Sequence, residues 1–247
     1  MRRIAIVTGA ARGIGLACTA RLARDDYHVV AVDRDTAALA SAAVQLQKDG
    51  IALETFTLDV ADTAAARTFV ARVVATHGRI DALVNNAGYT ERVALTSLTT
   101  EAWQRMLDVH VRGNVFLSQA VARDMVRRSE PGAIVNISSI RAEVAEPGQV
   151  HYCAAKGALR TMTRAIAQEL AKYRIRVNAV APGLTSTRMT ADSRADPAAF
   201  QSRRARIPLG RYAEADEIAA AVAYLLSDRA AFVTGTTVMV DGGYLAG

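Results

Sequence analysis

Short apolar segments alternate with amphipathic segments along most of this chain. The first such unit has an apolar run over residues 3–8, a glycine-rich turn over 9–15, an amphipathic segment over 16–25 and a second apolar run over 28–33. Short apolar runs between turn residues predict buried strands, and apolar positions three or four residues apart predict a helix that packs against them. The unit is therefore predicted to fold as strand, turn, helix and strand.

The same alternation continues toward the end of the chain. In order, we expect a helix over 36–48, a strand over 53–59, a helix over 63–77, a strand over 81–88, a helical segment over 100–128, a strand over 133–137, a helix carrying Tyr152 and Lys156, a strand over 175–182, a helix over 214–226 and a strand over 237–243. Repeated strand–helix units predict a parallel sheet with helices on both faces. The expected fold class is α/β, a doubly wound parallel sheet in a three-layer α/β/α arrangement, with a single domain over residues 1–247.

One segment, around residues 185–208, departs from this alternation. It is long and charged, and it lacks a strong periodicity. A segment of this kind beside a ligand cleft is typical of a lid. We therefore expect a substrate lid here.

Three glycines, Gly9, Gly13 and Gly15, follow the first predicted strand and open the first predicted helix. Glycine lets the backbone approach a pyrophosphate closely, and a helix N-terminus stabilises its charge. The turn therefore predicts a dinucleotide site, although its G-x-x-x-G-x-G spacing is one residue looser than the usual fingerprint.

The choice between NAD and NADP depends on Asp33, at the end of the second predicted strand. A carboxylate there can accept both hydroxyls of an adenosine ribose and would repel a 2′-phosphate, which favours NAD. Arg34 and Arg12 oppose this, because either guanidinium could pair with the phosphate. NAD is expected, with NADP possible.

A catalytic group is predicted between Gly132 and Lys156. An apolar run there ends in two serines, Ser138 and Ser139, as a buried strand does when it delivers side chains to the carboxyl edge of a sheet. Tyr152 and Lys156 lie four residues apart, on one face of the helix that follows, so an ammonium could lower the phenol pKa from about 10. Tyr152 is therefore a candidate general acid/base.

Composition excludes several classes of protein. The chain is 51% apolar, and its net charge of +6 comes from arginines spread along its length, so we expect no nucleic-acid partner. No apolar run reaches the roughly 20 residues of a membrane span, so we expect no membrane partner. Two cysteines cannot build a disulfide framework, and the first predicted strand leaves no room for a signal peptide, so a reducing cytoplasm is expected. We expect no metal site.

Taken together, the motifs resemble those of the single-domain short-chain dehydrogenase/reductase family. The motifs are Thr8-Gly9-x-x-x-Gly13-x-Gly15, Asn85-Asn86-Ala87-Gly88, Ser139, Tyr152-x-x-x-Lys156 and Pro182-Gly183. The resemblance implies a Rossmann-type fold and an oxidoreductase that moves a hydride between a nicotinamide cofactor and a secondary alcohol or carbonyl. It also implies a homotetramer, with interfaces made by the helices that follow the fourth and fifth strands and by the last strand.

The resemblance also implies roles for individual residues. Tyr152 would transfer the proton, Lys156 would bind the nicotinamide ribose and lower the tyrosine pKa, and Ser139 would position the carbonyl oxygen. The cofactor contacts expected, besides Tyr152 and Lys156, are Gly9, Arg12, Gly13, Ile14, Gly15, Asp33, Arg34, Asp59, Val60, Asn86, Ala87, Gly88, Pro182, Gly183, Thr185 and Thr187.

The chain departs from the family pattern at His110. The family has an asparagine in this place, and the proton relay is described through a water on that residue's backbone carbonyl. His110 could preserve such a relay through its own carbonyl, could transfer protons through its imidazole, or could simply be packed in the helix. It is counted here among the candidate catalytic residues.

The segment between Ser139 and Tyr152 forms one wall of the substrate pocket in the family. The candidate substrate contacts there are Ser139, Arg141, Glu143, Glu146 and Gln149. A polar wall suits polyhydroxy or charged small molecules, because an unmatched hydroxyl loses a hydrogen bond on burial. The expected substrate is a small polar alcohol, sugar or polyol. The alternatives are a 3-oxoacyl-thioester of an acyl carrier protein and, in another class, a cofactor-binding regulator without turnover.

Overall fold

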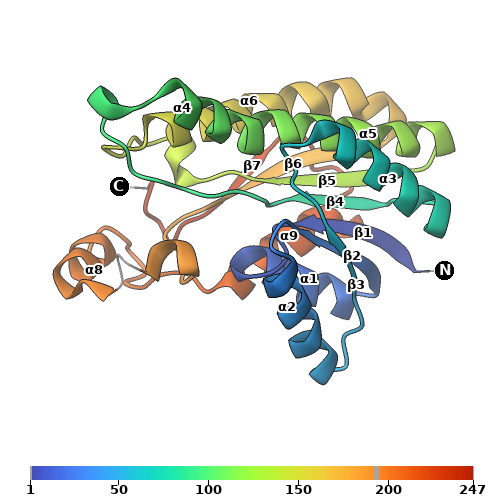
Figure 1. Cartoon of the computed structure of the whole chain (residues 1–247), viewed down its shortest axis with the longest axis horizontal. Coiled ribbons are helices and arrows are strands. Elements are labelled where there is room, and N and C mark those ends of the chain that lie inside the picture. Colours follow the sequence, from blue (N-terminus) through green and yellow to red (C-terminus); the bar gives the residue numbers. More distant parts are fainter. Residues whose placement is uncertain (1, 192–194, 247) are drawn as a thin grey trace.

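The computed structural model describes residues 2–191 and 195–246. These residues form one seven-stranded sheet of order β3-β2-β1-β4-β5-β6-β7, in which every neighbouring pair is parallel (Figure 1). The strands are β1 (Arg3–Thr8), β2 (Tyr27–Asp33), β3 (Glu54–Thr57), β4 (Ala82–Asn85), β5 (Gly132–Ile137), β6 (Ile175–Pro182) and β7 (Thr237–Val240). The predicted fold class, a doubly wound parallel sheet, is confirmed.

Helices cover both faces of the sheet (Figure 1). One face carries α1 (Gly13–Arg24), α2 (Thr36–Lys48) and α9 (Ala215–Leu226). The other carries α3 (Thr63–His77), α4 (Thr100–Leu107), α5 (Asn114–Arg128) and α6 (Val150–Leu170). A short helix, α8 (Pro197–Arg204), projects beyond the carboxyl end of β6.

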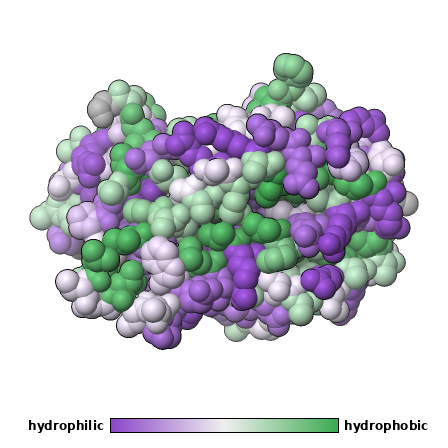
Figure 2. All heavy atoms as spheres, turned by 90° about the horizontal axis from the view of Figure 1, so that it is seen from above, coloured by the Kyte–Doolittle hydropathy of each residue, from purple (hydrophilic) through white to green (hydrophobic). Residues whose placement is uncertain are grey.

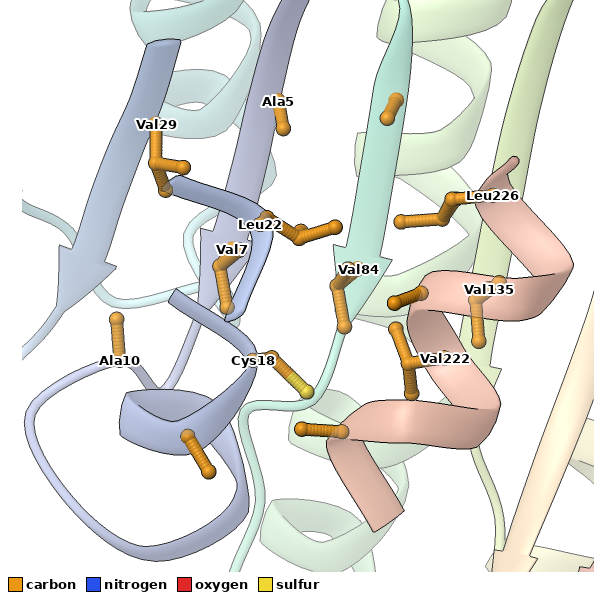
Figure 3. Packing of buried hydrophobic residues seen from close by; sticks show 14 of the residues in the cluster. Ala5, Val7, Ala10, Cys18, Leu22, Val29, Val84, Val135, Val222 and Leu226 are labelled. Carbon is orange, nitrogen blue, oxygen red and sulfur yellow. The ribbon is translucent and has the colours of Figure 1, made fainter. Parts of the chain in front are cut away.

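Side chains that alternate along the central strands fill two apolar layers. Val7, Val84 and Val135 point toward α1 and α9, where they meet Cys18 and Val222 (Figure 3). Their neighbours along the strands point to the opposite face and pack against α3 and α5. Burying one such aliphatic side chain contributes about 1.5–3 kcal/mol, so the continuous apolar runs are explained by burial on both faces.

Three strands end earlier than predicted, β3 at Thr57, β4 at Asn85 and β7 at Val240. Two further segments also differ from the sequence prediction. The helical segment over 100–128 is interrupted by a π-helical stretch, Asp108–Gly113, between α4 and α5. The segment around 185–208 is not irregular throughout, because it contains a 3-10 turn, Arg188–Thr190, and helix α8, while residues 192–194 of the predicted lid lie outside the described residues. Asp196 caps α8 by accepting hydrogen bonds from two backbone N–H groups of its first turn, and Pro197 starts the helix. A capping aspartate and a first-turn proline predict a helix start locally, but they do not appear in the apolar periodicity.

Because all strands are parallel, their carboxyl ends meet at one edge of the sheet. The loops that follow β1, β2, β3, β4 and β5 all emerge there, which is where ligands bind in open α/β sheets. None of the helices in the described ranges is long and apolar enough to cross a membrane.

Candidate active site

The turn after β1 is tied to the loop after β4. Gly9 has φ +64°, and a Cβ atom on it would lie 2.8 Å from Asn86 Nδ2. That amide donates hydrogen bonds to the carbonyl oxygens of Thr8 and Gly9, at 2.9 and 3.1 Å. In return the Thr8 hydroxyl accepts from the backbone N–H groups of Asn86 and Ala87, both at 3.0 Å. Glycine is required here both by the left-handed conformation and by the close approach.

Helix α1 begins without a side-chain cap. Its N-cap residue, Arg12, makes no capping hydrogen bond, and the first turn carries no acidic residue. Helices α2, α3 and α4 are instead capped by Asp35, Asp62 and Thr99. The amino end of α1 therefore offers backbone N–H groups and a positive dipole end to an anion, which fits the pyrophosphate of a dinucleotide.

A cleft of about 530 Å³ opens beside this turn. The predicted cofactor residues that line it are Gly9, Arg12, Gly13, Ile14, Asp33, Arg34, Asp59, Val60, Asn86, Ala87, Gly88 and Thr187. Sequence reasoning missed seven further lining residues, which are Asp35, Leu58, Tyr89, Thr90, Val109, Arg188 and Met189. The cleft runs across the carboxyl ends of β1 to β4. The strand order reverses between β1 and β4, and dinucleotides bind at such a reversal in open α/β sheets.

Six predicted cofactor residues are not among those that line the cleft, namely Gly15, Tyr152, Lys156, Pro182, Gly183 and Thr185. Gly15 lies beneath the turn, where a Cβ atom would come 2.0 Å from the Gly9 carbonyl oxygen. Gly183 packs against Asp241, because a Cβ atom on Gly183 would lie 2.7 Å from the Cα of Asp241. These two glycines allow close packing of backbone segments rather than contact with the cleft.

Two carboxylates and an arginine surround the end of β2. Asp33 accepts hydrogen bonds from the backbone N–H groups of Ala11 and Asp35, at 3.1 and 3.0 Å. Arg12 pairs with the carboxylate of Asp35. A hydrogen bond from the Ala38 backbone, followed by the Arg12 guanidinium, lowers the pKa of Asp35. Arg12 is therefore already paired with the Asp35 carboxylate, and the sequence spacing alone did not predict this pair.

The predicted catalytic residues converge on the neighbouring strand end. Ser139 follows β5, while Tyr152 and Lys156 come from α6, and all three side chains are buried. Lys156 Nζ lies 5.6 Å from the centre of the Tyr152 ring and donates to the backbone carbonyl of Ile137 at 2.7 Å. The helix spacing of four residues thus brings ammonium and phenol together, as predicted.

The predicted lowering of the tyrosine pKa is wrong for this structure. Burial raises the pKa of Tyr152 to about 12, although its hydrogen bond with Ser139 acts in the opposite direction. Burial also lowers the pKa of Lys156 to about 7. Desolvation disfavours the charged form of each group, so the phenol holds its proton at neutral pH.

His110 lies in the π-helical stretch, beside Tyr152. Its ring is perpendicular to that of Tyr152, with the centres 5.5 Å apart, and its Nε2 lies 2.8 Å from the carbonyl oxygen of Tyr89. A Cβ atom on Gly88 would come within 2.3 Å of the imidazole. Burial, followed by the charge of Lys156, holds the pKa of His110 well below 6.5. The imidazole is therefore neutral at pH 7.

The polar wall between Ser139 and Tyr152 is internally paired. Arg141 bridges to Glu146 at 2.6 Å, and Glu146 also meets Arg92. Glu143 pairs with Arg160 of α6, at 2.8 Å. The remaining candidate, Gln149, is buried and donates to the hydroxyl of Thr90 at 2.8 Å. Of the described residues lining the 530 Å³ cleft, none belongs to these four candidates, which form a separate wall beside it.

A family model described as Enoyl-(Acyl carrier protein) reductase, adh_short_C2, matches residues 9–245. The chain belongs to the short-chain dehydrogenase/reductase family. It is an oxidoreductase of that family, whose members use a nicotinamide cofactor.

Relatives named for different activities match nearly the whole chain. An L-xylulose reductase of Bos taurus is 39% identical over 99% of this chain and 97% of the relative. The 3-oxoacyl-[acyl-carrier-protein] reductase FabG of Thermotoga maritima is 36% identical over 98% of this chain and 97% of its own length. The crystal structure of a gluconate 5-dehydrogenase from Burkholderia cenocepacia, in complex with NADP and tartrate, superimposes with a TM-score of 0.94 at 36% identity, over 99% of this chain and 96% of that one.

Proposed function

We propose that this protein interconverts a small polar alcohol, of the sugar or polyol class, with its carbonyl form. The observation that carries the proposal is the convergence of Ser139, Tyr152 and Lys156 at the strand end next to the cofactor-sized cleft. When bound, a reduced nicotinamide supplies the hydride. The rest of the chemistry is positioning and proton transfer by side chains of this chain.

Tyr152 is proposed as the proton donor. Its raised pKa keeps the phenol protonated at neutral pH, so it can give a proton to the carbonyl oxygen as charge develops there during reduction. The Ser139 hydroxyl, which hydrogen-bonds with Tyr152, would hold the same oxygen. Lys156 would bind the nicotinamide ribose with an ammonium that is anchored on the Ile137 carbonyl. His110 would contribute its backbone carbonyl to the proton relay.

The substrate class is supported by the polar wall and by the relatives. Arg141, Glu146 and Arg92 form a chain of ion pairs beside the catalytic residues, running from partly buried to exposed positions. Such a chain suits hydroxyl groups better than a hydrocarbon tail. Two of the relatives reported above are named as an L-xylulose reductase and a gluconate 5-dehydrogenase. Thr187, Arg188 and Met189 line the cleft from the segment around 185–208, which supports the proposal that this segment is a substrate lid.

A second candidate is reduction of a 3-oxoacyl-thioester on an acyl carrier protein. It is favoured by the 36% identity to FabG and by the net charge of +6, which would attract an acidic carrier. A regulator without turnover is disfavoured, because binding a dinucleotide alone does not require the assembled Ser139, Tyr152 and Lys156.

NAD(H) is the proposed cofactor. Asp33 lines the cleft with a carboxylate held by two backbone N–H groups, and Asp35 neutralises Arg12, so the unpaired carboxylate of Asp33 would repel a 2′-phosphate. NADP(H) is the alternative, supported by Arg34 in the lining and by NADP in the gluconate 5-dehydrogenase structure.

Replacing Tyr152 by phenylalanine tests the reaction. Only the proton-donating hydroxyl is lost, so turnover should fall by about 100-fold or more, while the cofactor Kd stays within about twofold. The measurement is steady-state turnover on a panel of ketoses, polyols and 3-oxoacyl-thioesters, with cofactor binding followed by fluorescence. A variant that kept more than about a tenth of wild-type turnover would rule out Tyr152 as the acid, and activity confined to thioesters would select the second candidate.

Cofactor choice is tested by kcat/KM with NADH and with NADPH. We expect NADH to be preferred, and Asp33→Ser to move the ratio toward NADPH by about tenfold or more, since like-charge repulsion of roughly 1.4 kcal/mol would be removed. Asp25→Ser is the matched control, because Asp25 pairs with Arg21 at the far end of α1 and should leave the ratio unchanged. A wild-type preference for NADPH contradicts the assignment.

A further inference from the structure

Three side chains far apart in sequence meet at the sheet edge opposite the candidate active site. His28 is the second residue of β2, Glu54 is the first residue of β3, and His77 is the last residue of α3. Both imidazole Nε2 atoms approach the same carboxylate oxygen, Glu54 Oε2, at 3.2 Å from His28 and 2.8 Å from His77. One potential ligand atom from each of the three residues lies within 4.8 Å of the other two. Among residues 2–191 and 195–246, no other group of three His, Cys, Asp or Glu side chains meets this condition.

The parallel register of the edge strands produces this convergence. Glu54 pairs with Val30, so their side chains share a face, and His28 lies two residues before Val30 on that same face. Val30 belongs to the apolar layer beneath α3. That helix returns antiparallel to the strands, so its last residue, His77, comes back over their amino ends, where Gly78 ends the helix with φ +74°. No sequence motif links the three positions, and the sequence predicts no metal site.

The chemistry of the trio suits a divalent transition-metal ion. Imidazole nitrogen and carboxylate oxygen both bind Zn²⁺ at about 2.0–2.2 Å, which places tetrahedral ligand atoms roughly 3.4 Å apart. The separations of 3.2 and 2.8 Å from Glu54 Oε2 need only small side-chain rotations to reach this value.

The surroundings admit an ion and favour its charge. The side chains of His28 and Glu54 are each 37% exposed and that of His77 is 16% exposed, so a metal and its remaining water ligands can reach the site. The carboxyl end of α3 carries the negative end of the helix dipole, which stabilises a cation next to His77.

We propose that His28, Glu54 and His77 form a binding site for one divalent transition-metal ion of the zinc class, with water completing the coordination. The ion joins β3, the four-residue strand at the edge of the sheet, to β2 and to α3. Its role is structural, because it lies at the amino ends of strands whose carboxyl ends form the cleft. Holding β3 also holds Leu58, Asp59 and Val60, which follow it and line the cleft.

The test is a titration of the tag-free full-length chain with Zn²⁺ and, for its visible spectrum, with Co²⁺. We expect one ion per chain. The affinity for the ion should fall in Glu54→Gln, His28→Asn and His77→Asn, by at least the roughly 10–100-fold that follows the loss of an outer-shell partner. Saturating Zn²⁺ should raise the Tm of the wild type by about 5 °C and leave the Tm of these variants unchanged. Glu101→Gln, an exposed glutamate at the start of α4, is the control and should bind as the wild type does.

Each outcome decides the proposal. Stoichiometric binding that depends on all three residues, with a Co²⁺ spectrum that disappears in Glu54→Gln, supports it. Binding that persists in His28→Asn and His77→Asn, or that is weaker than millimolar in the wild type, overturns it. Because Glu54→Gln keeps the size of the side chain, its folding can be verified by turnover and by Tm without metal, so loss of the site is distinguishable from loss of the fold.

Discussion

His110 is the residue of the candidate active site that departs from the family pattern, and its surroundings limit what it can do. The imidazole contacts the backbone of Tyr89 through Nε2 and packs against Gly88 and Tyr152. Its pKa is well below 6.5, so it is not a proton donor at neutral pH. The ring therefore fills space and orients neighbours, while its backbone lies in the π-helical stretch, a local deformation frequent at functional sites.

This assignment predicts that His110→Asn retains turnover within about tenfold of the wild type, since the backbone carbonyl remains. The shape of the pH profile of kcat should also be unchanged, because a neutral imidazole does not contribute a titration near pH 6.5. Steady-state kinetics between pH 5 and 9 measure both quantities. A loss of 100-fold or more, or the disappearance of a titration step, would show instead that the imidazole transfers protons.

Among the elements, β5 and α6 must be held in register, because one carries Ser139 and the other carries Tyr152 and Lys156. A buried chain of hydrogen bonds does this. Asn136 of β5 accepts from Asn85 Nδ2 at 2.9 Å and donates to the Thr163 hydroxyl of α6 at 3.0 Å. Buried polar networks of this kind define one packing arrangement, since any shift leaves a polar group without a partner.

We predict that Asn136→Ala lowers the free energy of unfolding by about 2–4 kcal/mol, because Asn85 and Thr163 each lose a buried partner. Urea denaturation measures the change. Ser41→Ala is the control, since the exposed Ser41 hydroxyl only bonds the Ala37 carbonyl within α2, and its effect should stay within about 0.5 kcal/mol. An equally small effect for Asn136→Ala would mean that apolar packing alone holds the two elements.

At the scale of the whole molecule, some of the exposed apolar side chains lie on the elements that the resemblance to the family assigns to assembly. Phe116 on α5 and Val150 on α6 are 38% and 43% exposed. The face of the molecule drawn in Figure 2 carries hydrophobic residues among hydrophilic ones. Tyr224 on α9 and Met239 on β7, the last strand, are 46% and 36% exposed. Apolar patches of this kind mark protein–protein interfaces. We therefore propose that the chain forms the homotetramer expected from the family resemblance.

Light scattering coupled to gel filtration tests this assembly. The expected mass is four times that of the 26.3 kDa chain. Phe116→Asp should reduce it, because a charge placed in an apolar interface is desolvated without a partner. Leu209→Asp, at a 71% exposed position in the loop before α9, should not change the mass. A monomeric wild type would contradict the proposal.

Much of the fold and part of the site followed from the sequence alone. The bounds of α2, α3, β1 and β6 match the expected ranges, because apolar periodicity and turn residues act locally. Most of the predicted cofactor residues line one cleft, since a parallel sheet must bring the carboxyl ends of its strands to a single edge. The helix spacing likewise determined that Tyr152 and Lys156 would be neighbours.

Only the tertiary structure decided what depends on burial and on contacts between distant segments. The pKa of Tyr152 rises instead of falling, because desolvation is a property of the folded surroundings and not of helix spacing. The pairing of Arg12 with Asp35 depends on how the turn after β1 meets the end of β2. The meeting of His28, Glu54 and His77 depends on strand register, which sets the face of each side chain and leaves no local signature in the sequence.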